Sequence, residues 1–255
     1  MTIAVGIVAQ GGIVVAADTE ESSGYMKSSE TKILSVLGGV QLGKQTKPNV
    51  ATGACLISGA GDSGYVTALM YELADVFLDQ KTLVDKPLQK AFQACIKNFH
   101  AEHIIPFAGY PRVDRPSVEM LIAFNRKHRS GLLISEKSAL FKKMPYKAVG
   151  AGSIYAEILL HRLWGHADVK STQILAAYVV FMVKESIEGC GKYKQITTLH
   201  GSTIVPMEES SMLMPAEHPV SHMPWNEIDD LEREFRTTWA GAERETIWKL
   251  VKEHA

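Results

Sequence analysis

After Met1 the chain runs Thr2-Ile-Ala-Val-Gly-Ile-Val-Ala9, continues with Gln10-Gly11-Gly12, and then runs Ile13-Val-Val-Ala-Ala-Asp18. Two runs rich in valine and isoleucine around a glycine turn are typical of a β-hairpin. Both runs are apolar at nearly every position, so we expect the hairpin to be covered on both faces. The fold is therefore predicted to have a layer of structure on either side of this hairpin.

Further along the chain, runs of strands alternate with pairs of helices. Strands are predicted near residues 31–37, 54–58, 118–124, 132–135, 139–142, 146–149, 195–199 and 203–205. Helices are predicted over 63–77, 87–99, 154–164 and 172–187, where apolar residues recur at helical spacing. This order favours an α+β fold, a four-layer α/β/β/α sandwich of two antiparallel sheets. We expect it to occupy residues 1–205, followed by a proline-rich arm and a C-terminal helix in residues 206–255.

Composition excludes several classes of function. The chain has 255 residues, of which 46% are hydrophobic and 22% charged, and its net charge is -1. This is a globular composition without the basic field that would hold nucleic acid or anionic lipid. No apolar run is long enough to span a membrane. The three cysteines lie far apart without a CxxC motif, which argues against a disulfide scaffold and favours the cytoplasm.

No cofactor or metal is expected from the sequence. His100 and His103 are three residues apart, but no third ligand accompanies them at a metal-binding spacing.

Thr2 is the first residue that could carry chemistry. It directly follows Met1, and initiator methionine is removed when the second residue is small, so we expect Thr2 to become the N-terminus. A free α-amine has a pKa of about 8, so part of it is neutral near pH 7. An N-terminal threonine then holds a hydroxyl nucleophile and its own base in one residue. The alternative is that Thr2 is only the start of a strand.

A charged pair is predicted beside Thr2. The hairpin turn places Asp18 opposite Ala4 or Ile3, within a strand step or two of the Thr2 amine. A carboxylate that follows an apolar run needs a partner if it is buried, and Lys32 is the candidate. An ordinary surface ion pair between Asp18 and Lys32 is the alternative.

The same residues carry a resemblance to a known family. Five segments, in order, are similar to the N-terminal half of proteasome β-type subunits and of bacterial proteasome-like proteins: Thr2-Ile-Ala-Val-Gly-Ile-Val, Gly12-Ile-Val-Val-Ala-Ala-Asp18-Thr19, Gly24, Lys32-Ile33 and Ser58-Gly59-Ala-Gly61. Gly150-Ala151-Gly152-Ser153 resembles the family's glycine-rich turn before the third helix. The resemblance covers roughly residues 2–205 and implies the N-terminal-nucleophile (Ntn) hydrolase fold.

The resemblance also implies roles for individual residues. Thr2 would be the nucleophile, Asp18 and Lys32 the charged pair, and Gly59 the donor of a backbone N–H to the oxyanion. Residues that would contact the substrate are Thr19, Gly24 and Ile57.

The implied activity is that of a threonine peptidase in a self-compartmentalised homo-oligomeric ring. Its substrate would be a peptide or an unfolded protein, and such a ring leaves room for an ATPase partner.

Three positions depart from the β-type pattern. Ala151 stands where β subunits often have serine, and Ser186 and Gly189 stand where they have aspartate and serine. These departures keep open a catalytically inactive, structural ring subunit. An Ntn amidase that acts on a small amide is a further alternative, because a fold does not fix its substrate.

Overall fold

The computed structural model describes residues 2–23, 26–39, 51–79, 85–109, 116–126, 129–142, 145–165, 167–191 and 193–207. Gly24, the arm from residue 208 onward and the predicted C-terminal helix lie outside these residues.

The first five-stranded sheet contains the predicted hairpin. Its strand order is β10-β1-β2-β11-β12, with bounds β1 (Ile3–Ala9), β2 (Gly12–Asp18), β10 (Tyr146–Gly150), β11 (Lys194–His200) and β12 (Thr203–Met207). Ala4 pairs with Ala17, which is the register that the turn predicted. Every residue of β2 is buried, because the second sheet covers one face of the hairpin and a helix covers the other.

The second sheet has the order β5-β6-β7-β8-β9. Its bounds are β5 (Ile33–Gly39), β6 (Ala51–Gly61), β7 (Val118–Arg126), β8 (Arg129–Glu136) and β9 (Ala139–Lys142). β6 is longer than predicted, because pairing with β7 continues through its glycines as far as Gly61↔Val118. Those glycines suggested a strand end in the sequence, but here they remain within the ladder.

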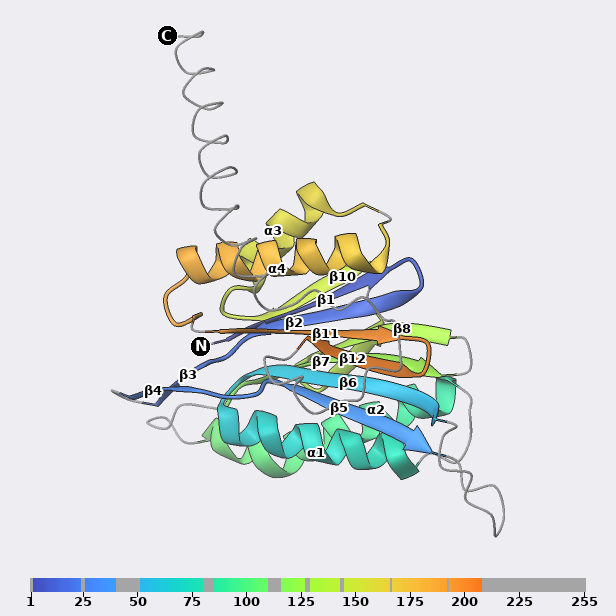
Figure 1. Cartoon of the computed structure of the whole chain (residues 1–255). Helices are drawn as coiled ribbons and strands as arrows, with labels where there is room; N and C mark the ends of the chain where they lie inside the picture. Colours follow the sequence, from blue (N-terminus) through green and yellow to red (C-terminus); the bar gives the residue numbers. More distant parts are fainter. Residues whose placement is uncertain are drawn as a thin grey trace, which may run out of the picture. The chain divides into compact units, whose positions relative to one another are not determined.

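Helix pairs form the outer layers (Figure 1). α1 (Ser63–Asp79) packs on β5 and β6 and is joined by α2 (Asp85–Phe99), while α4 (Val169–Ser186) packs on β1 and β2 beside α3 (Ser153–Leu163). Apolar side chains form one core between the two sheets and another between the second sheet and the helices α1 and α2. The predicted four-layer α/β/β/α sandwich is confirmed.

The hairpin after β2 was not predicted from the sequence, and neither were the short helices η1 (His100–Ile104) and η2 (Ile105–Gly109) that follow α2. β3 (Glu20–Ser23) and β4 (Met26–Ser29) form a two-stranded hairpin directly after β2. Each strand has four residues, and β3 (Glu-Glu-Ser-Ser) contains no apolar residue whose alternation could reveal it. None of the described helices has the length and apolar character needed to cross a bilayer.

Candidate active site

Thr2, Asp18 and Lys32 lie in direct contact. The Lys32 ammonium donates to Thr2 Oγ1 at 2.7 Å and to Asp18 Oδ1 at 3.0 Å. The Asp18 side chain is fully buried, and that of Lys32 is only 11% exposed. The alternative of a surface ion pair is therefore wrong, because the side chains of both partners are buried.

The buried pair is well supplied with hydrogen bonds. Asp18 Oδ1 also accepts from Ile3 N at 3.0 Å, and Oδ2 accepts from Gly191 N at 3.0 Å. The Lys32 ammonium has a third acceptor in the carbonyl oxygen of Glu20. A buried ion pair is tolerated when its remaining donors and acceptors are satisfied in this way. The geometry fixes the ammonium against the Thr2 hydroxyl.

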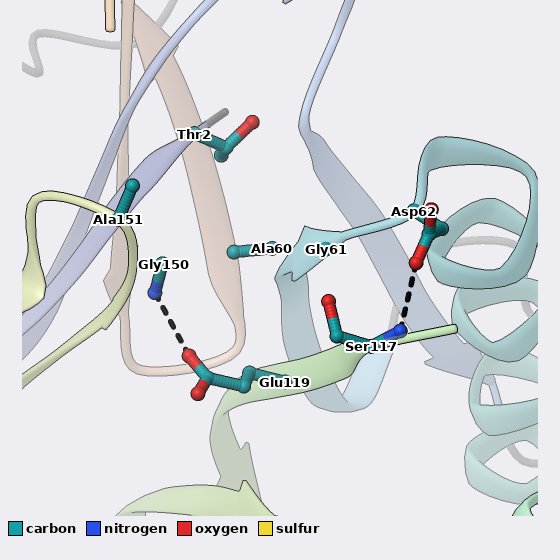
Figure 2. A pocket seen from close by; sticks show the side chains of 8 residues that line it. All are labelled: Thr2, Ala60, Gly61, Asp62, Ser117, Glu119, Gly150 and Ala151. Carbon is teal, nitrogen blue, oxygen red and sulfur yellow. Dashed lines mark hydrogen bonds between the residues drawn. The ribbon is translucent and has the colours of Figure 1, made fainter. Parts of the chain in front are cut away.

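A cavity of about 360 Å³ lies beside Thr2 (Figure 2). Its lining residues come from the ends of strands: Thr2, Ala60, Gly61, Asp62, Ser117, Glu119, Gly150 and Ala151. Pairing explains why they meet, because Ile3 is opposite Gly150 in one sheet and Gly61 is opposite Val118 in the other. Contacts of β10 with β6 and β7 then bring these strand ends of the two sheets together beside Thr2.

Two glycines shape this cavity. Gly61 and Gly150 have φ of +129° and +99°, a region that side chains rarely adopt. A Cβ added at Gly150 would collide with the carbonyl oxygen of Thr2, and one at Gly61 would collide with that of Ser117. The same Thr2 carbonyl accepts from Ala151 N at 3.0 Å. Gly150 therefore allows the turn before α3 to approach Thr2 closely.

Two carboxylates line the cavity, and sequence analysis assigned neither of them to the site. Glu119 Oε2 accepts from Gly150 N at 2.9 Å, and Asp62 Oδ2 accepts from Ser117 N at 2.7 Å. Each carboxylate ties together two strand ends that border the cavity (Figure 2). The available signal for Glu119 was a charge inside the apolar run 118–124. Asp62 directly precedes α1, and an aspartate in that position is typical of a helix N-cap.

The other predicted site residues are less directly placed. Gly59 is not among the lining residues, although its neighbours Ala60 and Gly61 are, and its Cα faces Val66 of α1. The Ile57 side chain is fully buried in the core beneath α1, so it does not line the cavity. Thr19 is buried, and its hydroxyl accepts from Ser29 Oγ at 2.9 Å and from Tyr193 N at 3.1 Å. The predicted roles of Gly59 and Thr19 stay predictions.

Other chemistry close to the pair is limited. Burial raises the pKa of the Cys190 thiol to about 11, so this thiol stays protonated at neutral pH and is a poor nucleophile. Among the described residues, no cluster of three or more His, Cys, Asp or Glu could hold a metal ion. Thr2 lines the cavity, and its hydroxyl accepts a hydrogen bond from the buried Lys32 ammonium.

Comparison with known proteins gives a match in structure but none in sequence. No protein-family model and no curated protein matches the chain. Among solved structures, an Anbu (Gly-1) mutant from Hyphomicrobium sp. strain MC1 superposes with a TM-score of 0.69 at 12% identity, over 98% of this chain and 97% of that one. Anbu (ancestral beta-subunit) from Yersinia bercovieri gives 0.69 at 11% identity, over 97% and 96%.

A third structure, described as the helical assembly of the Anbu complex from Pseudomonas aeruginosa, gives 0.69 at 13% identity over 97% and 96% of the two chains. These identities are too low to carry more than the fold.

The fold is that of the proteasome-like Ntn hydrolases, as the resemblance implied. Anbu proteins are among the solved structures that share this fold.

Proposed function

We propose that this chain, once Met1 is removed, is an N-terminal threonine hydrolase that cleaves peptide bonds. The observation that carries the proposal is the contact of the buried Lys32 ammonium with Thr2 Oγ1 at 2.7 Å. The Lys32 ammonium is held by the buried Asp18 carboxylate while it donates to the Thr2 hydroxyl. In this position it stabilises negative charge on Thr2 Oγ1 and disfavours protonation of the Thr2 amine.

The reaction follows from these groups. The Thr2 amine takes the proton of Oγ1 as that oxygen attacks the substrate carbonyl carbon. The ammonium of Lys32 lowers the pKa of the amine, which keeps more of it neutral and able to accept the proton. The amine then returns the proton to the leaving nitrogen, and an ester to Thr2 remains. Water hydrolyses the ester and restores the hydroxyl.

The resemblance gives Gly59 N–H the task of stabilising the tetrahedral oxyanion. We assign this chemistry to residues 1–205 and give residues 206–255 no chemical role.

Assembly and location belong to the same proposal. We propose that copies of the chain associate into a closed ring that admits peptides or unfolded proteins, with an ATPase as a further partner. The description of the Pseudomonas aeruginosa Anbu as a helical assembly supports association between copies. The cytoplasm suits the three free cysteines.

Substitution of Thr2 tests the catalytic proposal. We expect Thr2→Ala to lower kcat by about 10³-fold or more, because it removes the attacking oxygen. Thr2→Ser keeps the hydroxyl and the amine, so it should retain measurable turnover. The assay uses fluorogenic peptides together with small amides, on protein whose intact mass shows that Met1 is absent.

Both variants keep a small second residue, so they serve as matched controls for Met1 removal. Their melting temperatures should stay close to that of the wild type. Equal turnover by wild type and Thr2→Ala would contradict the mechanism. A correctly processed wild type without turnover would instead support the inactive, structural subunit, and turnover of small amides alone would support the amidase.

A further inference from the structure

Lys32 is held at its backbone as well as at its ammonium group. Its N–H donates to Gln195 Oε1 at 2.6 Å, and its carbonyl oxygen accepts from Ser58 Oγ at 2.7 Å. Gln195 lies on β11 in the first sheet, whereas Ser58 lies on β6 in the second. The residue that contacts the proposed nucleophile is therefore hydrogen-bonded to side chains from both sheets.

These contacts occur where regular pairing begins. The pairing of β5 with β6 starts at Ile33↔Ser58, one residue after Lys32. Backbone polar groups that leave water need partners, and at Lys32 polar side chains supply them. A lysine ammonium is joined to its backbone by a flexible four-carbon chain, so the position of the backbone helps to set where the ammonium can reach.

We propose that Gln195 is a positioning residue for the hydrolysis. Its side-chain oxygen fixes the Lys32 backbone so that the ammonium stays in hydrogen-bond contact with Thr2 Oγ1 and Asp18. The inference rests on the proposed function and adds a residue that lies 163 positions from Lys32 in the sequence. Gln195 is not among the residues that line the cavity, and its side chain contacts the backbone of Lys32, so in this proposal it acts through Lys32.

Gln195 suits a test better than Ser58. Ser58 is fully buried in a central strand, and its loss could prevent folding. Gln195 is half-buried. Gln195→Met removes the acceptor and keeps the length of the side chain, while Gln195→Glu keeps an acceptor oxygen.

Gln93 offers a matched control. Its Oε1 accepts from the backbone N–H of Leu140 at 2.7 Å, so Gln93→Met removes the same kind of hydrogen bond from α2, away from Lys32.

The experiment measures kcat and KM against pH for processed protein. We expect Gln195→Met to lower kcat about 10- to 100-fold, since small misplacement of a catalytic group has effects of this size. KM should change little. The rising limb of the pH profile should move to higher pH, because an ammonium displaced from Thr2 no longer lowers the pKa of the amine as strongly.

On the pH plateau, Gln195→Glu should have a kcat within about threefold of the wild-type value. Its added charge has little effect there, because the Thr2 amine is already neutral in most molecules. Gln93→Met should leave kcat and the pH profile unchanged while losing some thermal stability.

A second readout is independent of turnover. Competitive acetylation of the Thr2 α-amine, followed by mass spectrometry across pH, reports the pKa of the amine directly. If wild type has no turnover but Gln195→Met alone shifts the acetylation profile to higher pH, the positioning role stands and the proposed function fails. If wild type is active and Gln195→Met matches it in kcat and in both pH profiles, the positioning role is overturned. Equal shifts in Gln195→Met and Gln93→Met would also overturn it.

Discussion

At the scale of the residue, the candidate site depends on a few positions that are tightly constrained by their surroundings. Asp18 and Lys32 satisfy each other in a buried environment, where an isolated charge is strongly disfavoured. Gly150 has an equally strict requirement of a different kind, since its backbone conformation and its approach to Thr2 both exclude a side chain. Electrostatics therefore constrains one part of the site and backbone geometry another.

Gly150→Ala tests the geometric constraint. The new Cβ would collide with the Thr2 carbonyl oxygen at a φ of +99°, so the turn must move away from Thr2. We expect a loss of about 1–3 kcal/mol in the free energy of unfolding, measured by denaturant titration, and reduced turnover. Gly64→Ala is the control, because it lies in α1 with no atom near the added Cβ. That change should stabilise the chain by about 0.5–1 kcal/mol.

The element that covers the hairpin is α4, and its first turn has a capping residue. The Asp168 carboxylate accepts from Ser171 N at 2.7 Å, one of the donors that a helix start leaves without an intrahelical partner. This hydrogen bond lowers the pKa of Asp168 below its ordinary value. α4 packs on both β1 and β2, and its first turn lies at the hairpin turn, where Val169 is beside Gly12.

Asp168→Ala should lower the melting temperature at neutral pH. A lowered pKa in the folded state means that the carboxylate stabilises the fold above its ordinary pKa, and that this contribution is lost as the pH falls through the folded value. The difference between wild type and Asp168→Ala should therefore shrink below about pH 4, in thermal melts followed by circular dichroism. Asp168→Asn keeps a capping side chain without a charge, so the difference in melting temperature between Asp168→Asn and Asp168→Ala should not change with pH. A difference in melting temperature between wild type and Asp168→Ala that stays constant with pH would contradict this account.

At the scale of the whole molecule, apolar side chains remain exposed on the outer helices. Ile154 and Ile158 on α3 are 77% and 47% exposed, and Tyr71 and Leu78 on α1 are 61% and 52% exposed. Residues 154 and 158 are one helical turn apart and share a face. Large apolar side chains grouped on one face are typical of contact surfaces between subunits.

We expect the chain to be a homo-oligomer in which this face of α3 contacts a neighbouring copy. Light scattering at micromolar concentration should give a multiple of the 28.0 kDa chain mass. The double substitution Ile154→Glu with Ile158→Glu should reduce that mass without unfolding, because both positions are exposed in the single chain. Unchanged far-ultraviolet circular dichroism serves as the control for folding. A 28.0 kDa monomer for the wild type would contradict the ring.

Local patterns in the sequence predicted the strands of the two five-stranded sheets, the four α-helices and the first contact of the site. The glycine turn set the register of β1 and β2, and that register alone predicted that Asp18 would lie beside the start of β1. Asp18 Oδ1 accepts from Ile3 N, as expected. Helical spacing predicted all four described α-helices, because each buries one apolar face. The polar β3–β4 hairpin was missed for the same reason, since β3 has no apolar face to reveal it.

The sequence thus determined the layers, the hairpin and the candidates Thr2, Asp18 and Lys32. Tertiary structure alone decided what surrounds them: Gln195 and Gly191 reach Lys32 and Asp18 across 163 and 173 positions, and Glu119 meets Gly150 across 31. The physical reason is that neighbours within a hairpin are fixed by its turn. Contacts between distant strands depend instead on how whole sheets pair and pack, which no local pattern of residues records.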